Sequence, residues 1–138
     1  MTTQPMSKTD AASLNALVEG LADPTSCDEP SSRTVDNSEG GFMALHVERI
    51  GTQMYSLAHY FRQNGDMMRD PDVVLFKDAH GRWFPATFQQ DGGGVPVYTV
   101  ALEFSDERIT GVYRRRYREL RDFMRGWLRN LRVQQGIR

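Results

Sequence analysis

Residues 59–72 are the stretch of the chain whose side chains could carry out chemistry, and we call them the polar segment. A histidine in this stretch can exchange a proton near neutral pH. Aspartates in the same stretch offer the carboxylate oxygens that Mg²⁺ prefers in proteins. One interpretation is therefore a metal-dependent hydrolase or nuclease, whose catalytic residues would be His59, Asp66, Asp70 and Asp72.

Two further interpretations of the polar segment need no catalysis. Asn64-Gly65 is a strong turn signal, because both residues tolerate positive φ. Arginines on either side of this turn can pair with the aspartates, which predicts a connection between two strands that satisfies its own polar groups. The alternative is a binding loop, with Arg62, Gln63, Asn64, Asp66, Arg69 and Asp70 as its binding residues.

Other motifs of catalysis and cofactor binding find no support in the sequence. Cys27 is the one cysteine, and the glycines at 92–94 lack the Gly-Lys-Ser/Thr sequence of a phosphate-binding loop. The aspartates of the polar segment also miss the spacing of a calcium-binding EF-hand. We therefore expect no cofactor, no metal site and no catalytic residues, and we favour a protein that is not an enzyme.

The second candidate region is a set of arginines near the C-terminus. Residues 105–133 contain no proline, and their apolar residues recur in steps of four and three, as on one face of a helix. These apolar positions are 109, 113, 117, 120, 124, 127 and 131. At about 100° per residue, six arginines share the opposite face. We call them the arginine row: Arg114, Arg118, Arg121, Arg125, Arg129 and Arg132.

Arg116 departs from this pattern, because it projects close to the apolar face of the same helix. A guanidinium near an apolar surface is unfavourable unless a carboxylate neutralises it. The sequence therefore predicts an acidic partner for Arg116.

The arginine row could bind an acidic protein or nucleic acid, or it could stay solvated or paired within the molecule. The net charge of −1 conceals an asymmetry, since residues 1–106 hold 15 acidic and 7 basic residues, whereas residues 107–138 hold 3 acidic residues and 10 arginines. The acidic part would repel a polyanion, so a protein partner is favoured over nucleic acid. The residues expected to bind it are Arg114, Arg118, Arg121 and Arg125.

The elements that position these side chains follow from hydrophobic periodicity. Residues 9–21 predict a short amphipathic helix, and residues 22–41 a flexible linker rich in Ser, Asp, Glu, Pro and Gly. Period-two patterns predict strands at 43–48, 54–61, 73–77, 83–89 and 97–104.

We therefore predict an α+β fold, in which an antiparallel sheet of four to five strands packs on a long C-terminal amphipathic helix, with a short N-terminal helix beside it. The expected organisation is an N-terminal helical segment (1–21), the linker (22–41) and one α+β domain (42–138). No apolar run is long enough to cross a membrane, no secretory signal is visible and the cysteine is unpaired. These features predict a cytoplasmic protein without membrane contact.

The polar segment also resembles the signature of an uncharacterised bacterial domain family, written HYxxQNGDxMRDP in this chain. The similarity continues through residues 83–91 and 123–131. Members of that family are small proteins, many of them carried on plasmids, phages and other mobile elements. The resemblance implies no activity, but it implies a setting in which small accessory proteins bind and block host enzymes. We therefore expect a non-enzymatic protein-binding module that inhibits a host enzyme.

Overall fold

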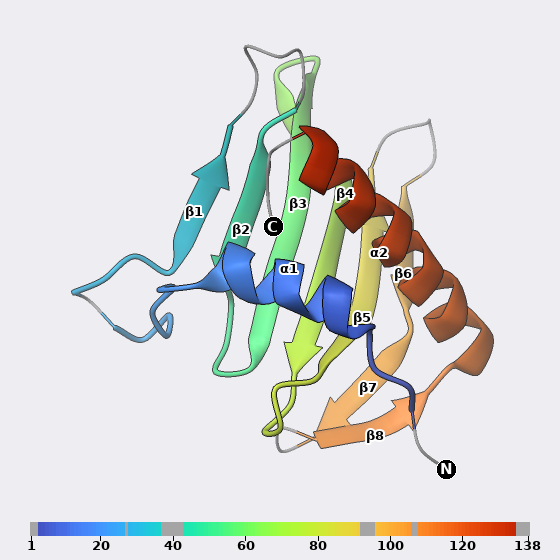
Figure 1. Cartoon of the computed structure of the whole chain (residues 1–138). Coiled ribbons are helices and arrows are strands. Elements are labelled where there is room, and N and C mark those ends of the chain that lie inside the picture. The colour runs from blue at the N-terminus through green and yellow to red at the C-terminus, as the bar shows by residue number, and fades with distance from the viewer. Residues whose placement is uncertain (1–2, 27, 37–42, 92–95, 106–107, 135–138) are drawn as a thin grey trace.

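In a computed structural model of the chain, two helices cross one face of a six-stranded antiparallel sheet (Figure 1). The structure describes residues 3–26, 28–36, 43–91, 96–105 and 108–134, except for the side chains of residues 61–63. No helix in these ranges combines the length and the apolar character that crossing a membrane requires.

The main sheet is a meander in which each strand pairs with the next one along the chain. Its strands are β1 (Ser32–Val35), β2 (Leu45–Arg49), β3 (Met54–Gln63), β4 (Asp66–Lys77), β5 (Trp83–Gln90) and β6 (Val97–Val100). A second sheet pairs β7 (Leu102–Ser105) with β8 (Arg108–Val112). The helices are α1 (Lys8–Val18) and α2 (Arg114–Gln134).

The α+β class is confirmed, but the prediction of a sheet of four to five strands was wrong. The described chain forms six strands in the main sheet and two in a second sheet. The strand expected at 97–104 divides at Ala101, whose N–H donates to Ala86 and whose carbonyl accepts from Tyr113. The residues at 108–112 form β8, so the C-terminal helix begins at Arg114 and not near residue 105.

Strand β1 lies within residues 22–41, for which the sequence predicts a linker. It pairs with β2 from Ser32↔Glu48 to Val35↔Leu45. Its Arg33 donates from Nη1 to the carbonyl of Leu17 at 3.0 Å and from Nη2 to that of Glu19. Carbonyls at the C-terminal end of a helix have no hydrogen-bond donor within the helix, so the guanidinium of a β1 residue supplies the donors here.

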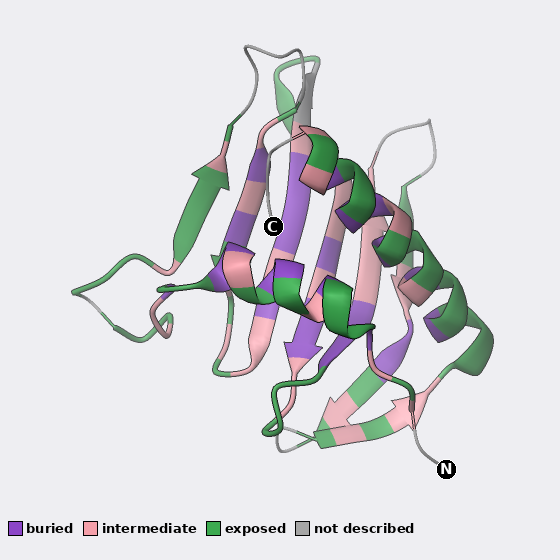
Figure 2. Ribbon diagram, viewed as in Figure 1, coloured by how far each residue is buried: buried purple, intermediate pink, exposed green. Residues whose placement is uncertain are grey.

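The core lies between the helices and the sheet, where buried residues gather on the inner side of α2 and along β2–β5 (Figure 2). The amphipathic stripe predicted for α2 is present, and it supplies Tyr117, Leu120, Met124, Trp127, Leu128 and Leu131. Helix α1 adds Leu14, Leu17 and Val18. The sheet meets them with apolar side chains that are almost completely buried: Leu45, Val47, Leu57, Val73 and Leu75.

Truncation of the α2 stripe tests how much this packing contributes to stability. Leu128 is 0% exposed, so Leu128→Ala should lower the free energy of unfolding by about 2–5 kcal/mol. Val133 lies on the same helix but is 82% exposed, and Val133→Ala should change it by less than about 0.5 kcal/mol. Urea unfolding followed by circular dichroism measures both variants, and equal losses would contradict the packing described here.

Candidate functional site

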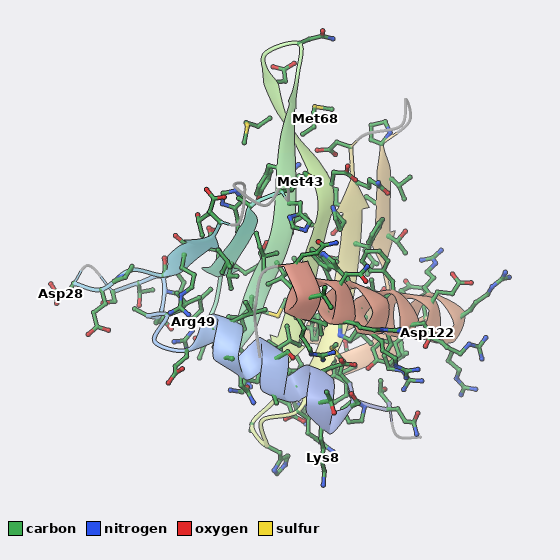
Figure 3. All side chains as sticks on the ribbon, turned by 45° about the horizontal axis from the view of Figure 1, so that its top comes forward. Lys8, Asp28, Met43, Arg49, Met68 and Asp122 are labelled. Carbon is green, nitrogen blue, oxygen red and sulfur yellow. The ribbon has the colours of Figure 1, made fainter. Side chains whose placement is uncertain are left out.

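The polar segment is a β-hairpin that extends beyond the helices (Figure 1). Strand β3 continues to Gln63 and β4 begins at Asp66, so Asn64 and Gly65 alone form the turn. Both turn residues have positive φ, 53° and 86°, as a tight two-residue hairpin turn requires. The turn signal in the sequence is confirmed, and the residues around it are strands. Met68 lies on β4 near the tip of this hairpin (Figure 3).

A β-bulge decides which way the side chains of this hairpin point. Ala58 pairs with Asp72 and Tyr60 pairs with Arg69, so His59 alone faces two residues of β4, Asp70 and Pro71. In an unbroken strand, residues two apart share a face. The extra residue in β4 breaks that alternation. As a result Asp72 shares a face with Arg69, and Asp70 belongs to the other face.

On the face away from the helices, the polar groups satisfy one another. Arg69 lies 3.5 Å from Asp72 and 3.6 Å from Asp91, measured from guanidinium nitrogen to carboxylate oxygen. Asp72 also accepts a 2.7 Å hydrogen bond from Ser56. The backbone N–H of Arg69 donates a hydrogen bond to the carboxylate of Asp91. This bond lowers the pKa of Asp91, and the side chains of Gln89 and Arg69 lower it further, although burial raises it. Arg69 therefore serves the hairpin itself.

The remaining binding residues expected in the polar segment lie at the tip. Asn64 and Asp66 are exposed to solvent there. Arg62 and Gln63 belong to β3, but their side chains lie outside the described residues.

On the face toward the helices, His59 is buried and its two ring nitrogens are both engaged. Nδ1 lies 2.9 Å from the carbonyl of Ala44, and Nε2 lies 3.2 Å from the indole nitrogen of Trp127. An indole N–H can only donate, so Nε2 accepts and Nδ1 carries the proton that bonds Ala44. His59 thus links β3 to α2 through both ring nitrogens.

A groove of about 480 Å³ opens beside this pair, between α2 and the strands β3–β5. We call it the aromatic groove. It is lined by Met43, His59, Asp70, Pro71, Phe88, Gln90, Phe123, Trp127, Asn130 and Gln134. Of the predicted catalytic residues, His59 and Asp70 meet here. Sequence analysis did not identify the aromatic residues of the groove, of which Trp127 belongs to the predicted helix stripe and Phe123 is 40% exposed.

The four residues of the hydrolase hypothesis are not gathered into one site. Asp70 lines the aromatic groove, Asp72 lies on the opposite face and Asp66 lies at the hairpin tip. Across the described ranges of the chain, no three His, Cys, Asp or Glu side chains are placed so that they could hold a metal ion.

The arginine row divides into two groups. Arg121 donates to the side chain of Gln4 at 2.9 Å, and Arg132 donates to Ser13 and to Asp10, both at 2.8 Å. These two arginines therefore hold the N-terminal segment and α1. The other four are exposed, and their guanidinium groups have no hydrogen bond or ion pair within the described part of the chain: Arg114, Arg118, Arg125 and Arg129.

The prediction of an acidic partner for Arg116 was wrong. Its guanidinium lies 4.7 Å from the centre of the Tyr113 ring and 3.4 Å from the carbonyl of Val100. Because α2 begins only at Arg114, Arg116 belongs to the first turn and remains exposed, so no buried charge has to be neutralised.

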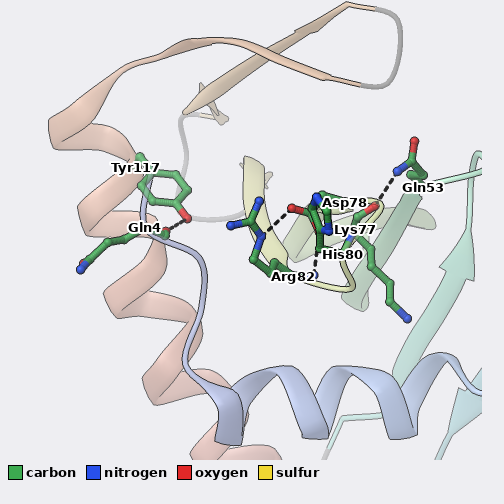
Figure 4. A network of polar contacts seen from close by, with 7 residues as sticks. All are labelled: Gln4, Gln53, Lys77, Asp78, His80, Arg82 and Tyr117. Atoms are coloured by element: carbon green, nitrogen blue, oxygen red, sulfur yellow. Dashed lines mark hydrogen bonds and ion pairs between the residues drawn. The ribbon is translucent and has the colours of Figure 1, made fainter. Parts of the chain in front are cut away.

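A larger cavity, about 740 Å³, lies at the end of the molecule that β8 and the β4–β5 turn form. Asp78 organises this turn by accepting from the backbone of His80 and Arg82 and from the Arg82 guanidinium (Figure 4). Burial raises the pKa of Asp78, but these hydrogen bonds outweigh it and lower the pKa overall. Asp78 and Arg82 are therefore engaged in the turn, while Arg108 and Arg114 also line the cavity.

The link between His59 and Trp127 can be tested by removing one donor. Trp127→Phe keeps an aromatic ring but deletes the indole N–H, which leaves Nε2 of the buried His59 without a partner. The expected loss is about 1–3 kcal/mol in the free energy of unfolding. Phe123→Leu, a change in the neighbouring half-exposed ring, should cost less, and a Trp127→Phe variant as stable as the parent would rule out this link.

The hairpin network predicts a pH dependence. Because the folded pKa of Asp91 is below its usual value, its carboxylate stabilises the fold above the unfolded pKa of about 3.9 and loses that effect as the pH falls through the folded pKa. Melting temperatures of the parent and Asp91→Asn should differ at pH 5–7 and converge below about pH 3.5. The melting temperature of Asp66→Asn, at the exposed tip, should stay close to that of the parent across this pH range. A gap between parent and Asp91→Asn that persists at pH 2.5 would argue against the network.

Comparison with known proteins gives a family and no activity. Neither the curated proteins nor the solved structures contain a match to this chain. A family described as a domain of unknown function (DUF6908) matches residues 16–137, which include every strand, α2 and the aromatic groove. The chain therefore belongs to the DUF6908 family.

Proposed function

We propose that this protein is a non-enzymatic binding module that docks on an acidic protein surface through the free part of its arginine row. The observation that supports the proposal is the group formed by Arg114, Arg118, Arg125 and Arg129, which are exposed and unpaired within the described chain. On the same helix Arg115 pairs with Glu119, whereas these four arginines have no such partner. Four unpaired cations along one side of a helix favour an external carboxylate partner.

The scaffold suits such a role because α2 is held firmly on its other sides. Its inner face is buried in the core, and Arg121 and Arg132 tie it to the N-terminal segment and α1. From Arg114 to Arg129 the helix rises about 22 Å, which is the length of a protein–protein contact patch. The helix backbone is already ordered, so binding costs only the rotamer freedom of the arginine side chains.

Charge favours a protein partner over nucleic acid. Residues 1–106 carry a net charge of −8 from 15 acidic and 7 basic residues, so a polyanion is repelled at long range. Acidic side chains also lie on α2 itself, at Glu119 and at Asp122, which Figure 3 labels. A folded protein surface with a short acidic strip can match the row and avoid these carboxylates, whereas a phosphate backbone is negative along its whole length.

The resemblance of the polar segment to proteins of bacterial mobile elements suggests the setting. Small accessory proteins of such elements act in the host cytoplasm, and we place this chain among them. Its partner would be the acidic face of a host enzyme, which the protein inhibits by covering it.

Catalysis is the weaker alternative, because the groups it needs are engaged elsewhere. His59 uses both ring nitrogens in the fold, and Asp72 and Asp70 lie on opposite faces of the hairpin. A hydrolase would need these residues to converge on one substrate atom.

Two charge-matched variants test the proposal with a defined probe. The row variant is Arg125→Gln with Arg129→Gln, and the control is Arg115→Gln with Arg116→Gln, which removes the same charge from the same helix. The probe is a fluorescent 20-residue helical peptide with Glu along one side and neutral residues elsewhere, titrated by anisotropy at several salt concentrations. The row variant should bind roughly 5-fold more weakly than the parent, since each exposed ion pair contributes about 0.2–1 kcal/mol.

The control variant should bind the peptide within about twofold of the parent, and added salt should weaken the parent's binding. If both variants bind the peptide equally weakly, net charge alone explains the binding, and the assignment of the surface to the arginine row is overturned. The parent is also titrated with a 20-base-pair DNA duplex. Tighter binding of the duplex than of the peptide, with a steep salt dependence, would identify nucleic acid as the partner in place of a protein.

A further inference from the structure

The aromatic groove lies on the opposite side of α2 from the arginine row, and it has a chemistry of its own. Arg125 and Arg129 are each two residues from Trp127, so they project about 160° away from it around the helix axis. An inference about the groove therefore does not rest on the proposed function.

Ring faces and edges form one side of the groove. Phe88 and Phe123 meet edge to face with their centres 5.3 Å apart, and the centres of Phe123 and Trp127 lie 5.8 Å apart. Trp127 is only 8% exposed, whereas Phe123 is 40% exposed. Trp127 is thus held in the core, while Phe123 is accessible to a ligand. The face of an aromatic ring carries partial negative charge.

The lining also includes one carboxylate, Asp70, which is half-buried. It accepts a 2.6 Å hydrogen bond from Gln90, and no cation of the described residues pairs with it. The adjacent Arg69 is held on the other face by Asp72 and Asp91. His59 has both ring nitrogens engaged, one with Ala44 and one with Trp127. Asp70 is the one carboxylate among the described lining residues, and no lysine or arginine lines the groove.

We infer that the aromatic groove binds an organic cation, a substituted ammonium or a guanidinium group. Aromatic faces attract such cations, and a nearby carboxylate adds a direct ion pair in a partly desolvated place. An anion would be repelled by Asp70, and a neutral apolar ligand would cover this carboxylate without compensating it. The volume of about 480 Å³ lies in the range of small-molecule sites, and amide oxygens at Gln90 and Asn130 are available for N–H or O–H groups of the ligand.

The two tryptophans provide the readout, because only one of them lines the groove. The indole N–H of Trp127 bonds His59 beside the groove, while that of Trp83 bonds Asn15 and its ring is 0% exposed. In ¹⁵N–¹H spectra of the full chain, choline should shift the Trp127 indole signal with a Kd of about 1–10 mM and leave that of Trp83 in place. The neutral isostere 3,3-dimethylbutan-1-ol should bind at least about 10-fold more weakly.

Variants separate the contribution of charge from that of shape. Asp70→Asn removes the charge and keeps an acceptor for Gln90, and it should weaken choline binding about 10-fold. The matched control Asp66→Asn, on the same strand at the exposed tip, should change it by less than about twofold. Phe123→Leu removes one ring and should also weaken choline binding, so the test stands even where Asp70→Asn does not fold.

Comparison with N-acetylarginine amide identifies the source of the cation. Tighter binding of this compound supports an arginine side chain of a partner, and tighter binding of choline supports a free ammonium compound. The inference is overturned if the neutral isostere binds as tightly as choline, if Asp70→Asn and Phe123→Leu both bind like the parent, or if neither cation shifts the Trp127 signal at about 50 mM.

Discussion

The burial of one side of α2 against the sheet is the interaction on which the other features of this protein depend. Met124, Leu128 and Leu131 are completely buried there, and Trp127 adds a hydrogen bond to His59 of β3. Apolar burial sets how close the helix lies to the sheet, and a directional hydrogen bond sets its rotation about its axis. With that rotation set, the arginines lie along one flank of the helix and the aromatic rings along the other. Both candidate surfaces are thus consequences of one packing arrangement.

The parts of the fold that were predicted are those whose burial follows a simple period. Strands β2 to β5 alternate buried and exposed residues or are buried on both faces, and α2 repeats at 3.6 residues. Strand β1 escaped prediction because Ser32, Arg33 and Thr34 are exposed, and its strand character comes from pairing with β2. The residues of β8 were predicted as part of the helix, because Ile109 and Tyr113 precede Tyr117 in steps of four. Periodicity cannot separate a helix from a short strand that shares its phase.

Sequence reasoning identified the important segment of the candidate site but not its geometry. A loop would have allowed His59 and the three aspartates to turn toward one another, and the hydrolase hypothesis assumed this. In two paired strands the backbone dictates the direction of each side chain, and neighbours point to opposite faces. The aromatic walls were missed for another reason. Phe88 and Phe123 have the residue types of core positions, and their partial exposure depends on how α2 packs on β5, which the sequence pattern does not specify.

Pro71 explains why the groove forms at this point of the sheet. A proline has no N–H to donate to the neighbouring strand, so the regular ladder between β3 and β4 is interrupted where it stands, between the pairs Ala58↔Asp72 and Tyr60↔Arg69. His59 is left opposite the bulge with no single cross-strand neighbour, and its ring turns to α2 for a hydrogen-bond partner. Without the bulge, Asp70 and Asp72 would share a face and repel one another. The interruption separates them, so that Asp72 joins the hairpin network and Asp70 lines the aromatic groove, where its charge supports the inferred binding of a cation.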